Sequence, residues 1–471
     1  SLTQAKPTAP SSAARASNVR ARTMVQYHEP TAAKCQGGDE IEVTATFTTT
    51  VAPALPLQEH RLTLSNLDLI LPPIDVGVFF CYVAADAAAV STLKAALAKV
   101  LVAYYPLAGE VVTNAAGEPE LLCSGRGVDF AEAAADGVEL REVRLGLPDE
   151  SVEKLVPRKK AGVMSVQVTK FRCGGAVVGC TFDHRICDAY SFNMFLVAWA
   201  AAARGAPAPP SPSFNRSLLA PSIPPPSCTA GTLADRLFVP VSHVPPPTGP
   251  PPAAVNRIYH VAAADVAALQ ASAGPGRTKL ESFTAHLWRL YARAFTAHSC
   301  SMGVVVDGRA RVSPDGAMKP YFGNVLTIPY GVIGAGELRG MALADVAEDV
   351  HRWVSEAATG EHFGELVDWV EARRPEPTVA RAYLGVGDGE GAGVVACVVS
   401  SGMRLPVGEV DFGWGVPAFA SYHFPWPGGA GYVMPMPSAR GGGDWVVYVH
   451  AAPELVRIME EEPTMFRAPE I

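Results

Sequence analysis

The chain has 471 residues, of which 49% are hydrophobic and 18% charged, and its formal net charge is −8. This length and composition predict a large folded protein with a substantial core and exclude a disordered or fibrous chain. The acidic balance, without a long run of Lys or Arg, does not suggest a nucleic-acid or anionic-membrane surface. The longest apolar stretch, 194–203, is about half as long as a bilayer requires, so no membrane span is predicted.

The nine cysteines are odd in number and include no CxxC pair. This pattern favours reduced thiols and a cytoplasmic protein over a disulfide framework or a zinc site, and no metal site is predicted. Residues 1–40 begin with a basic segment rich in Ser, Thr and Ala that contains no acidic residue before Glu29. Such a segment fits a transit peptide, but we expect a disordered or poorly ordered extension instead.

Proline divides the remaining chain. Fifteen of the 41 prolines lie between Pro207 and Pro252, a density that opposes long helices and central strands. We therefore predict an N-terminal domain over 41–206, a Pro-rich crossover linker over 207–256 and a C-terminal domain over 257–471.

Both predicted domains mix helical and strand-like periodicity. In the first, the spacing of apolar residues predicts helices over 91–105 and 192–203 and a strand over 176–182. In the second, the same patterns predict helical sequence over 279–295 and 343–374, and strands over 303–306, 393–399 and 444–450. The fold class is therefore α/β, with mixed sheets flanked by helices and a ligand site between the two halves. The glycine-rich stretch 385–393 lacks GxGxxG spacing, and we interpret it as a loop.

Familiar catalytic motifs are missing from the sequence: it contains no GxSxG, no HExxH and no GxxxxGK[ST]. The segment from His184 to Asp188 is instead a candidate catalytic site, because it joins a predicted apolar strand to a predicted apolar helix. Side chains at such a corner can face a cleft, where an imidazole can act as a base. His184 alone also fits a structural histidine. Cys187 could be proposed as a nucleophile, but a small buried hydrophobe is the interpretation we prefer.

A second candidate is Asp411-Phe-Gly-Trp-Gly415, in which Gly413 and Gly415 flank Trp414. The two glycines predict a tight turn with a packed indole, and we favour a structural role over a catalytic one. The aromatic run from Tyr422 to Trp426 could stack a substrate, although core packing with one exposed loop is the interpretation we prefer.

Together, the ordered signatures HxxxD and DFGWG resemble those of the plant BAHD acyltransferases. Further segments resemble motifs of the same family: Leu97-Ala98 with Tyr104 to Gly109, Gly127 to Ala133, Asn215 to Leu219, Ala285 to Trp288, Asp307 to Arg311 and Tyr321 to Asn324. Three positions depart from the family pattern, namely Glu110 for Arg, Asn215 for Asp and Gly402 for Trp. All three lie outside the two signatures, so we expect differences in the pocket rather than loss of catalysis.

The resemblance implies two chloramphenicol-acetyltransferase-like domains with the active site at their interface, and acyl transfer from coenzyme A. It implies that His184 is the general base and that Asp188 turns away to pair with Arg309. Asp411, Gly413, Trp414 and Gly415 would support the site from a distance. Coenzyme A would bind near Arg277, Thr278, Lys279 and Arg311, although for any one of these side chains taken alone we prefer the interpretation of solvated surface.

The family resemblance further implies a cytoplasmic monomer with no permanently bound cofactor, which takes acyl-CoA and a small-molecule acceptor as substrates. Segments 64–73 and 75–82 resemble a branch that includes acyltransferases for coniferyl alcohol and related phenylpropanoids. We therefore expect a hydroxycinnamoyl or acetyl donor and a hydroxyl acceptor. N-acylation of a polyamine such as putrescine or spermidine, or a catalytically silent binding protein of the same fold, are the alternatives.

Overall fold

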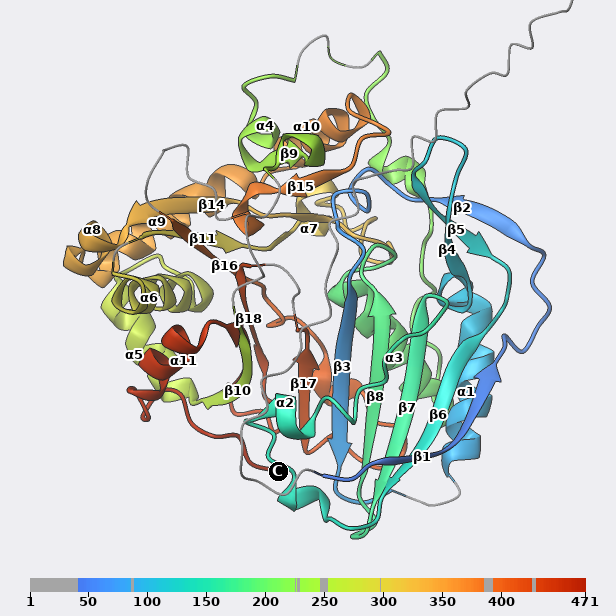
Figure 1. The fold of residues 1–471 in the computed structure, drawn as a ribbon. Helices are drawn as coiled ribbons and strands as arrows, with labels where there is room; N and C mark the ends of the chain where they lie inside the picture. The colour runs from blue at the N-terminus through green and yellow to red at the C-terminus, as the bar shows by residue number, and fades with distance from the viewer. Residues whose placement is uncertain are drawn as a thin grey trace, which may run out of the picture.

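The computed structural model describes residues 41–471 apart from 86–88, 225, 227–228, 246–252, 297, 385–392 and 426–428. The predicted N-terminal extension and nearly all of the glycine-rich loop lie outside the described residues. Two six-stranded sheets, each built mainly from one half of the chain, form the framework (Figure 1).

The first sheet contains, in spatial order, β1 (Thr44–Val51), β6 (Val128–Ala135), β7 (Met164–Phe171), β8 (Ala176–Asp183), β3 (Asp75–Tyr82) and β17 (Phe419–His423). Strands β6 and β7 run parallel, and the other neighbours are antiparallel. Every residue of β8 is buried, as expected for an apolar strand at the centre of a covered sheet. Helices α1 (Ala89–Ala103) and α3 (Ala189–Ala203) pack together against this sheet (Figure 1).

The second sheet contains, in spatial order, β10 (Val255–Val261), β19 (Trp445–Ala451), β18 (Gly431–Pro437), β16 (Val394–Val399), β11 (Ser299–Val304) and β14 (Tyr330–Gly334). It is also mixed, because β18, β16 and β11 run parallel to one another. Helices lie on the side away from the first sheet (Figure 1): α5 (Ala263–Ala273), α6 (Lys279–Ala294), α8 (Ala335–Gly340), α9 (Leu343–Ala357) and α11 (Pro453–Glu460). The predicted α/β class, with mixed sheets flanked by helices, is confirmed.

Smaller elements complete the described chain. The short strands are β2 (His60–Thr63), β4 (Glu110–Thr113), β5 (Pro119–Cys123), β9 (Phe238–Pro240), β12 (Val306–Asp307), β13 (Leu326–Thr327) and β15 (Thr378–Ala380). The remaining α-helices are α2 (Pro148–Ser151), α4 (Leu233–Leu237), α7 (Arg309–Val312) and α10 (Gly360–Glu371).

Several predicted elements differ in detail from the observed ones. The helical stretch 343–374 is two helices, because Thr359 caps a new one by accepting a hydrogen bond from the His362 amide at 3.1 Å. The strand predicted over 303–306 is split between the end of β11 and the short β12. The crossover is not wholly irregular, since α4 and β9 form in a stretch of it that has few prolines. The domain boundaries stay a prediction.

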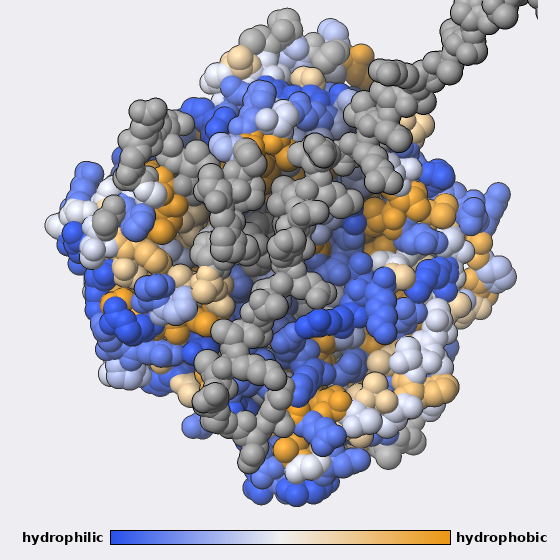
Figure 2. All heavy atoms as spheres, in the orientation of Figure 1, coloured by the Kyte–Doolittle hydropathy of each residue, from blue (hydrophilic) through white to orange (hydrophobic). Residues whose placement is uncertain are grey.

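Strand β17 links the two halves. It follows the DFGWG segment of the second half and pairs antiparallel with β3 of the first sheet, from Phe419 opposite Cys81 to His423 opposite Gly77. A C-terminal segment thereby contributes to the N-terminal sheet, and side chains from both halves reach the space between the sheets. On the face shown in Figure 2, hydrophilic residues are interspersed with separate hydrophobic areas.

Candidate active site

His184 occupies the corner between β8 and α3, as the sequence pattern predicted. Its backbone amide donates to the carbonyl of Ile74 at 3.0 Å, which ties the corner to the start of β3. The imidazole lines a cavity of about 350 Å³ between the two sheets. The cavity wall is largely apolar and contains six aromatic side chains: Phe182, Tyr190, Tyr383, Tyr422, Phe424 and Tyr432. Such a site suits a planar organic group.

Burial lowers the pKa of His184 below its ordinary value of 6.5. Its own carbonyl, Asp188 and the side chain of Asn324 oppose this effect without reversing it. The imidazole is therefore neutral at physiological pH, which is the state that a general base requires.

Asp188 also lines this cavity, but Arg309 engages its carboxylate. Its carboxylate forms a bidentate ion pair with Arg309, with Oδ2 at 2.8 Å from Nη1 and Oδ1 at 3.1 Å from Nη2. Oδ1 also accepts from the amide of Ser191 at 2.9 Å and so caps α3. Both charged residues are at most 4% exposed. The corner carrying His184 is thus fastened to the second half of the chain by a buried ion pair and a helix cap.

Asn324 is a site residue to which the sequence analysis gave no role. Its side-chain amide donates to the carbonyl of His184 at 2.9 Å and to Asp68 Oδ1 at 2.9 Å. Both Asn324 and Asp68 are fully buried. The sequence places them far apart in two motif-like segments, so only the folded structure brings them to the base.

The DFGWG segment lies away from the cavity and forms a tight turn. The Asp411 carboxylate accepts from the amides of Gly413 and Gly415 at 2.7 and 2.9 Å, and both glycines have positive φ, at 98° and 87°. The indole of Trp414 packs edge-on against Tyr82 of β3, with ring centroids 5.2 Å apart. None of Asp411, Gly413, Trp414 and Gly415 lines this cavity.

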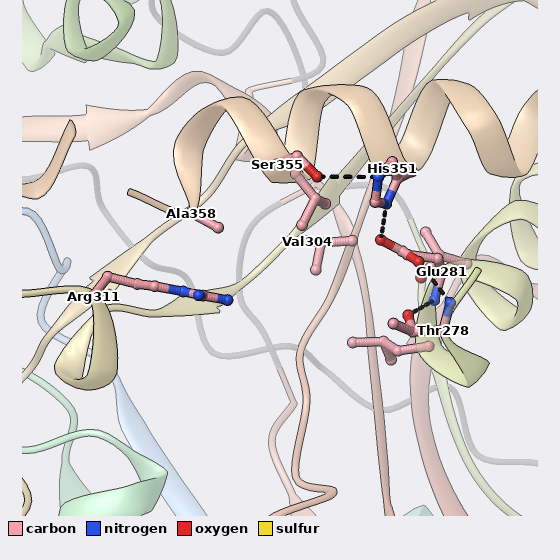
Figure 3. A pocket seen from close by; sticks show the side chains of 10 residues that line it. Thr278, Glu281, Val304, Arg311, His351, Ser355 and Ala358 are labelled. Carbon is pink, nitrogen blue, oxygen red and sulfur yellow. Dashed lines mark hydrogen bonds and ion pairs between the residues drawn. The ribbon is translucent and has the colours of Figure 1, made fainter. Parts of the chain in front are cut away.

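A second cavity of about 290 Å³ adjoins the first, because Leu280, Val304, Val354 and Arg311 line both. Figure 3 shows Arg311 reaching toward it from one side, with Thr278 and Glu281 on α6 and His351 and Ser355 on α9 opposite. His351 Nδ1 lies 2.8 Å from Glu281 Oε1.

Of the predicted coenzyme residues, Thr278 and Arg311 line this second cavity. Thr278 also caps α6 in a capping box with Glu281. Arg277 forms an ion pair with Glu348 at 3.1 Å and is absent from the lining, as is the exposed Lys279. The structure thus places two of the four beside a cavity, one in a partly buried ion pair and one on the surface.

Three other sequence interpretations can be compared with the structure. Cys187 is fully buried, and burial raises the pKa of its thiol well above the ordinary value, which opposes a thiolate nucleophile. Tyr422 and Phe424 are buried as expected, yet they also line the main cavity; Trp426 lies outside the described residues. At Gly402 a Cβ would lie 2.8 Å from that of Met436, so methionines occupy the space where the family has Trp.

In the described part of the chain, no cluster of three or more His, Cys, Asp or Glu residues could hold a metal ion. Nor is any described helix long and apolar enough to cross a bilayer.

Comparison with known proteins identifies the class. The model of the Transferase family matches residues 41–465, so the chain belongs to this family, the BAHD acyltransferases, and is an acyl-CoA-dependent acyltransferase. Hydroxycinnamoyltransferase 2 of Oryza sativa subsp. japonica is 29% identical over 85% of this chain and 94% of its own. Putrescine hydroxycinnamoyltransferase 1 of the same organism is 31% identical over 80% of this chain and 88% of its own.

Solved structures agree on the fold. Vinorine synthase superposes with a TM-score of 0.68 at 22% identity, covering 90% of this chain and 99% of its own. TRI101 of F. graminearum, solved with coenzyme A and T-2 mycotoxin, gives a TM-score of 0.67 at 15% identity over 87% of this chain and 99% of its own. These similarities confirm the predicted two-domain fold.

Proposed function

We propose that this acyltransferase moves a hydroxycinnamoyl or acetyl group from coenzyme A to the hydroxyl of a small phenylpropanoid-like alcohol, with His184 as the general base. The observation that carries this proposal is the position of His184, a half-buried imidazole on the wall of an aromatic-lined cavity between the sheets. The hydroxycinnamoyltransferases among the curated relatives support the choice of donor.

The chemistry follows from the state of the imidazole. Neutral His184 accepts the proton of the acceptor hydroxyl, and the oxygen attacks the thioester carbonyl to form a tetrahedral oxyanion. Collapse of this intermediate breaks the carbon–sulfur bond, and the coenzyme A thiolate takes the proton back from the imidazolium. No acyl-enzyme is needed, which agrees with the neutral, buried thiol of Cys187.

Coenzyme A is a polyanion, and the second cavity offers it a cation and a helix start. Arg311 has no carboxylate partner among the described residues and lines both cavities. Thr278 stands at the beginning of the sixteen-residue helix α6, where backbone amides favour anions. The thioester arm would pass from this cavity along Arg311 to His184, and exposed Lys279 would meet the phosphates at the mouth.

The charges of the main cavity favour a hydroxyl over a charged amine. Among its described lining residues, Asp188 and Asp307 both contact the guanidinium of Arg309. The two charged lining residues without an ion-pair partner among the described residues are the cations Arg311 and Arg404. A polyamine would meet repulsion there, because an ammonium requires acidic partners. N-acylation stays the alternative, since the putrescine and 5-hydroxyanthranilate transferases are relatives of this chain.

The test measures the release of free coenzyme A thiol and the mass of the product, with p-coumaroyl, feruloyl and acetyl coenzyme A as donors. Acceptors are monolignols, shikimate, fatty alcohols and polyamines, each tested alone. Ester formation that is lost in His184→Ala but kept in His243→Ala, which alters an exposed histidine, would support the proposal. Amide formation would move the acceptor to amines, and no thiol release with any pair would favour a silent binding protein.

The coenzyme path has a separate test. Arg311→Ala is expected to raise KM for acyl-CoA with little change in the acceptor KM, whereas Lys99→Ala, at an exposed position of α1, changes neither. Equal acyl-CoA KM values in both variants would remove Arg311 from the path.

A further inference from the structure

The second cavity combines an aliphatic wall with a small hydrogen-bonded cluster. The aliphatic part of its wall comes from Leu280, Val304, Val354 and Ala358. The cluster consists of Glu281 on α6 and of His351 and Ser355 on α9, and Figure 3 shows Arg311 extending toward the cavity from the opposite side. Pockets of this kind, apolar with a few convergent polar groups, are the usual form of small-ligand sites. The coenzyme path proposed above gives His351 no task.

Glu281 holds the imidazole of His351 in one orientation. Its Oε2 accepts from the amide of Thr278 at 2.7 Å, and its Oε1 lies 2.8 Å from His351 Nδ1. Burial alone would raise the pKa of Glu281, but the hydrogen bonds with Thr278 and His351 outweigh burial and leave that pKa below its ordinary value of 4.5. An ionised carboxylate can only accept, so Nδ1 carries a proton and donates it to Oε1.

The other ring nitrogen of His351 is available to a ligand. In a neutral ring with its proton on Nδ1, Nε2 is a hydrogen-bond acceptor. The hydroxyl of Ser355 lies 3.4 Å from Nε2, which is longer than an ordinary hydrogen bond. The His351 side chain is 37% exposed, so a molecule in the cavity can reach the ring.

A secondary amide matches the two sides of this cavity. Its N–H can donate to Nε2 of His351, and its carbonyl oxygen can accept from the guanidinium of Arg311. Arg311 has no carboxylate partner in the part of the chain that the structure describes and lines both cavities. The pantetheine arm of coenzyme A carries two secondary amides joined by methylene groups, and these groups suit the aliphatic wall.

We propose that His351 binds an amide of the pantetheine arm of acyl-CoA in the second cavity, and so makes the complete arm a requirement for the donor. This inference rests on the proposed function for the route of the coenzyme. It adds the part of the coenzyme that occupies the cavity and a residue that selects it. His351 is a binding residue, because the thioester lies farther along the route, at His184.

The experiment compares three donors that share one acyl group. They are p-coumaroyl-CoA, p-coumaroyl-pantetheine, which lacks the nucleotide and its phosphates, and the p-coumaroyl thioester of propanethiol, which lacks both amides. His351→Ala is expected to raise KM for the first two donors by the same factor, about 10-fold, as the loss of one hydrogen bond does. It should leave KM for the propanethiol ester and kcat for all three donors unchanged.

A binding measurement gives the same comparison without acyl transfer. Isothermal titration calorimetry with free coenzyme A and free pantetheine should show both Kd values about 10-fold higher in His351→Ala than in the wild type. If His351→Ala does not fold, His351→Phe replaces it, because it keeps a ring and removes both nitrogens. The same increase is expected.

His260→Ala is the matched control. His260 also pairs with a carboxylate, that of Asp444 at 3.1 Å, and its side chain is 32% exposed, yet it lines neither of the two cavities. This variant is expected to leave the Kd of both ligands unchanged. Equal increases in His260→Ala and His351→Ala would show a general structural effect and overturn the proposal.

The two ligands separate the amide from the phosphates. A weaker affinity of His351→Ala for coenzyme A but not for pantetheine would assign His351 to a phosphate and overturn the amide assignment. Unchanged Kd values, or no binding of pantetheine to the wild type, would also overturn it. If the Kd values depend on His351 as expected but no ester forms with any alcohol, the inference stands and the proposed function alone fails.

Discussion

Removing the carboxylate of Asp188 should destabilise the protein much more than removing that of Asp307, although both contact the same guanidinium. Asp188 has a side chain that is 3% exposed and lies at 2.8 Å from Arg309, whereas the side chain of Asp307 is 36% exposed and lies at 3.2 Å. Breaking the Asp188–Arg309 pair is costly because it leaves a desolvated charge, whereas water screens the Asp307–Arg309 pair.

The magnitude follows from the bonds that are lost. Asp188→Ala leaves a buried guanidinium with one carboxylate fewer, which costs about 3–5 kcal/mol. It also removes the cap of α3, worth about 1 kcal/mol by itself but partly included in the same loss. We therefore expect the free energy of unfolding to fall by about 4 kcal/mol, against less than about 1 kcal/mol for Asp307→Ala.

Urea unfolding followed by tryptophan fluorescence provides the assay, with both variants and the wild type measured under identical conditions. Asp188→Asn should fall between the two, since its amide oxygen can still cap Ser191 but carries no charge. Equal transition midpoints for Asp188→Ala and Asp307→Ala would show that burial does not make the Asp188–Arg309 pair the costlier one to break. So would an Asp188→Ala variant of wild-type stability without activity, because Asp188 would then act on the chemistry itself.

Three further predictions concern pH and the backbone. Burial lowers the pKa of His184 below 6.5. In a pH–rate profile, kcat/KM should therefore decrease on the acidic side with a midpoint below pH 6.5. A midpoint above that value would contradict a desolvated base. Burial lowers the pKa of His362 to about 4. The unfolded state therefore binds more protons between that value and 6.5, so the free energy of unfolding decreases as the pH is lowered through this window, by up to about 3 kcal/mol. His362→Gln should flatten this dependence in urea titrations at successive pH values, and an unchanged slope would place its cause elsewhere. Gly413 has φ 98°, so Gly413→Ala should lower the free energy of unfolding by about 1–2 kcal/mol, as measured by thermal unfolding. Gly408→Ala, where φ is not positive, should not lower it. Equal losses in the two variants would argue against backbone strain.

The sequence predicted well what depends on local pattern. The corner between β8 and α3 was expected because an apolar strand precedes His184 and an apolar helix follows it. The helix begins at Ala189, three residues earlier than the predicted Phe192, since Asp188 acts as a cap and the periodicity of apolar residues does not register caps. The break between α9 and α10 was missed for the same reason, because Thr359 does not interrupt the spacing of apolar residues.

Long-range pairing could not be predicted from the pattern alone. The contact between Asn324 and the backbone of His184 joins residues 140 positions apart, and a lone buried amide has no periodic signature. Strand β17 has only five residues, Phe419–His423, and nothing in its composition assigns it to the sheet of the other half. The main cavity likewise arises from the packing of both halves, whereas residues of the second half alone line the second cavity. Position along the sequence does not show that Thr278 and Arg311 line a cavity while Arg277 and Lys279 do not.

The distance between the DFGWG turn and the cavity does not make the turn irrelevant to the site. Helix α3 is capped at its start by Asp188, which forms an ion pair with Arg309 of the second half. Its other end adjoins Arg204, whose guanidinium donates to the Asp411 carbonyl at 2.5 Å and lies 3.4 Å from the Asp411 carboxylate. Residues of the second half therefore hold both ends of the helix that follows the base.

The chain then continues from the turn into β17, which brings Tyr422 to the cavity wall. The Tyr422 hydroxyl accepts a hydrogen bond at 2.8 Å from Asn193 in the middle of α3. A shift of the turn would thus move the end of α3 and the cavity wall together, because one helix and one strand connect them. This connection gives a physical reason for a distant signature to affect a site that it does not touch.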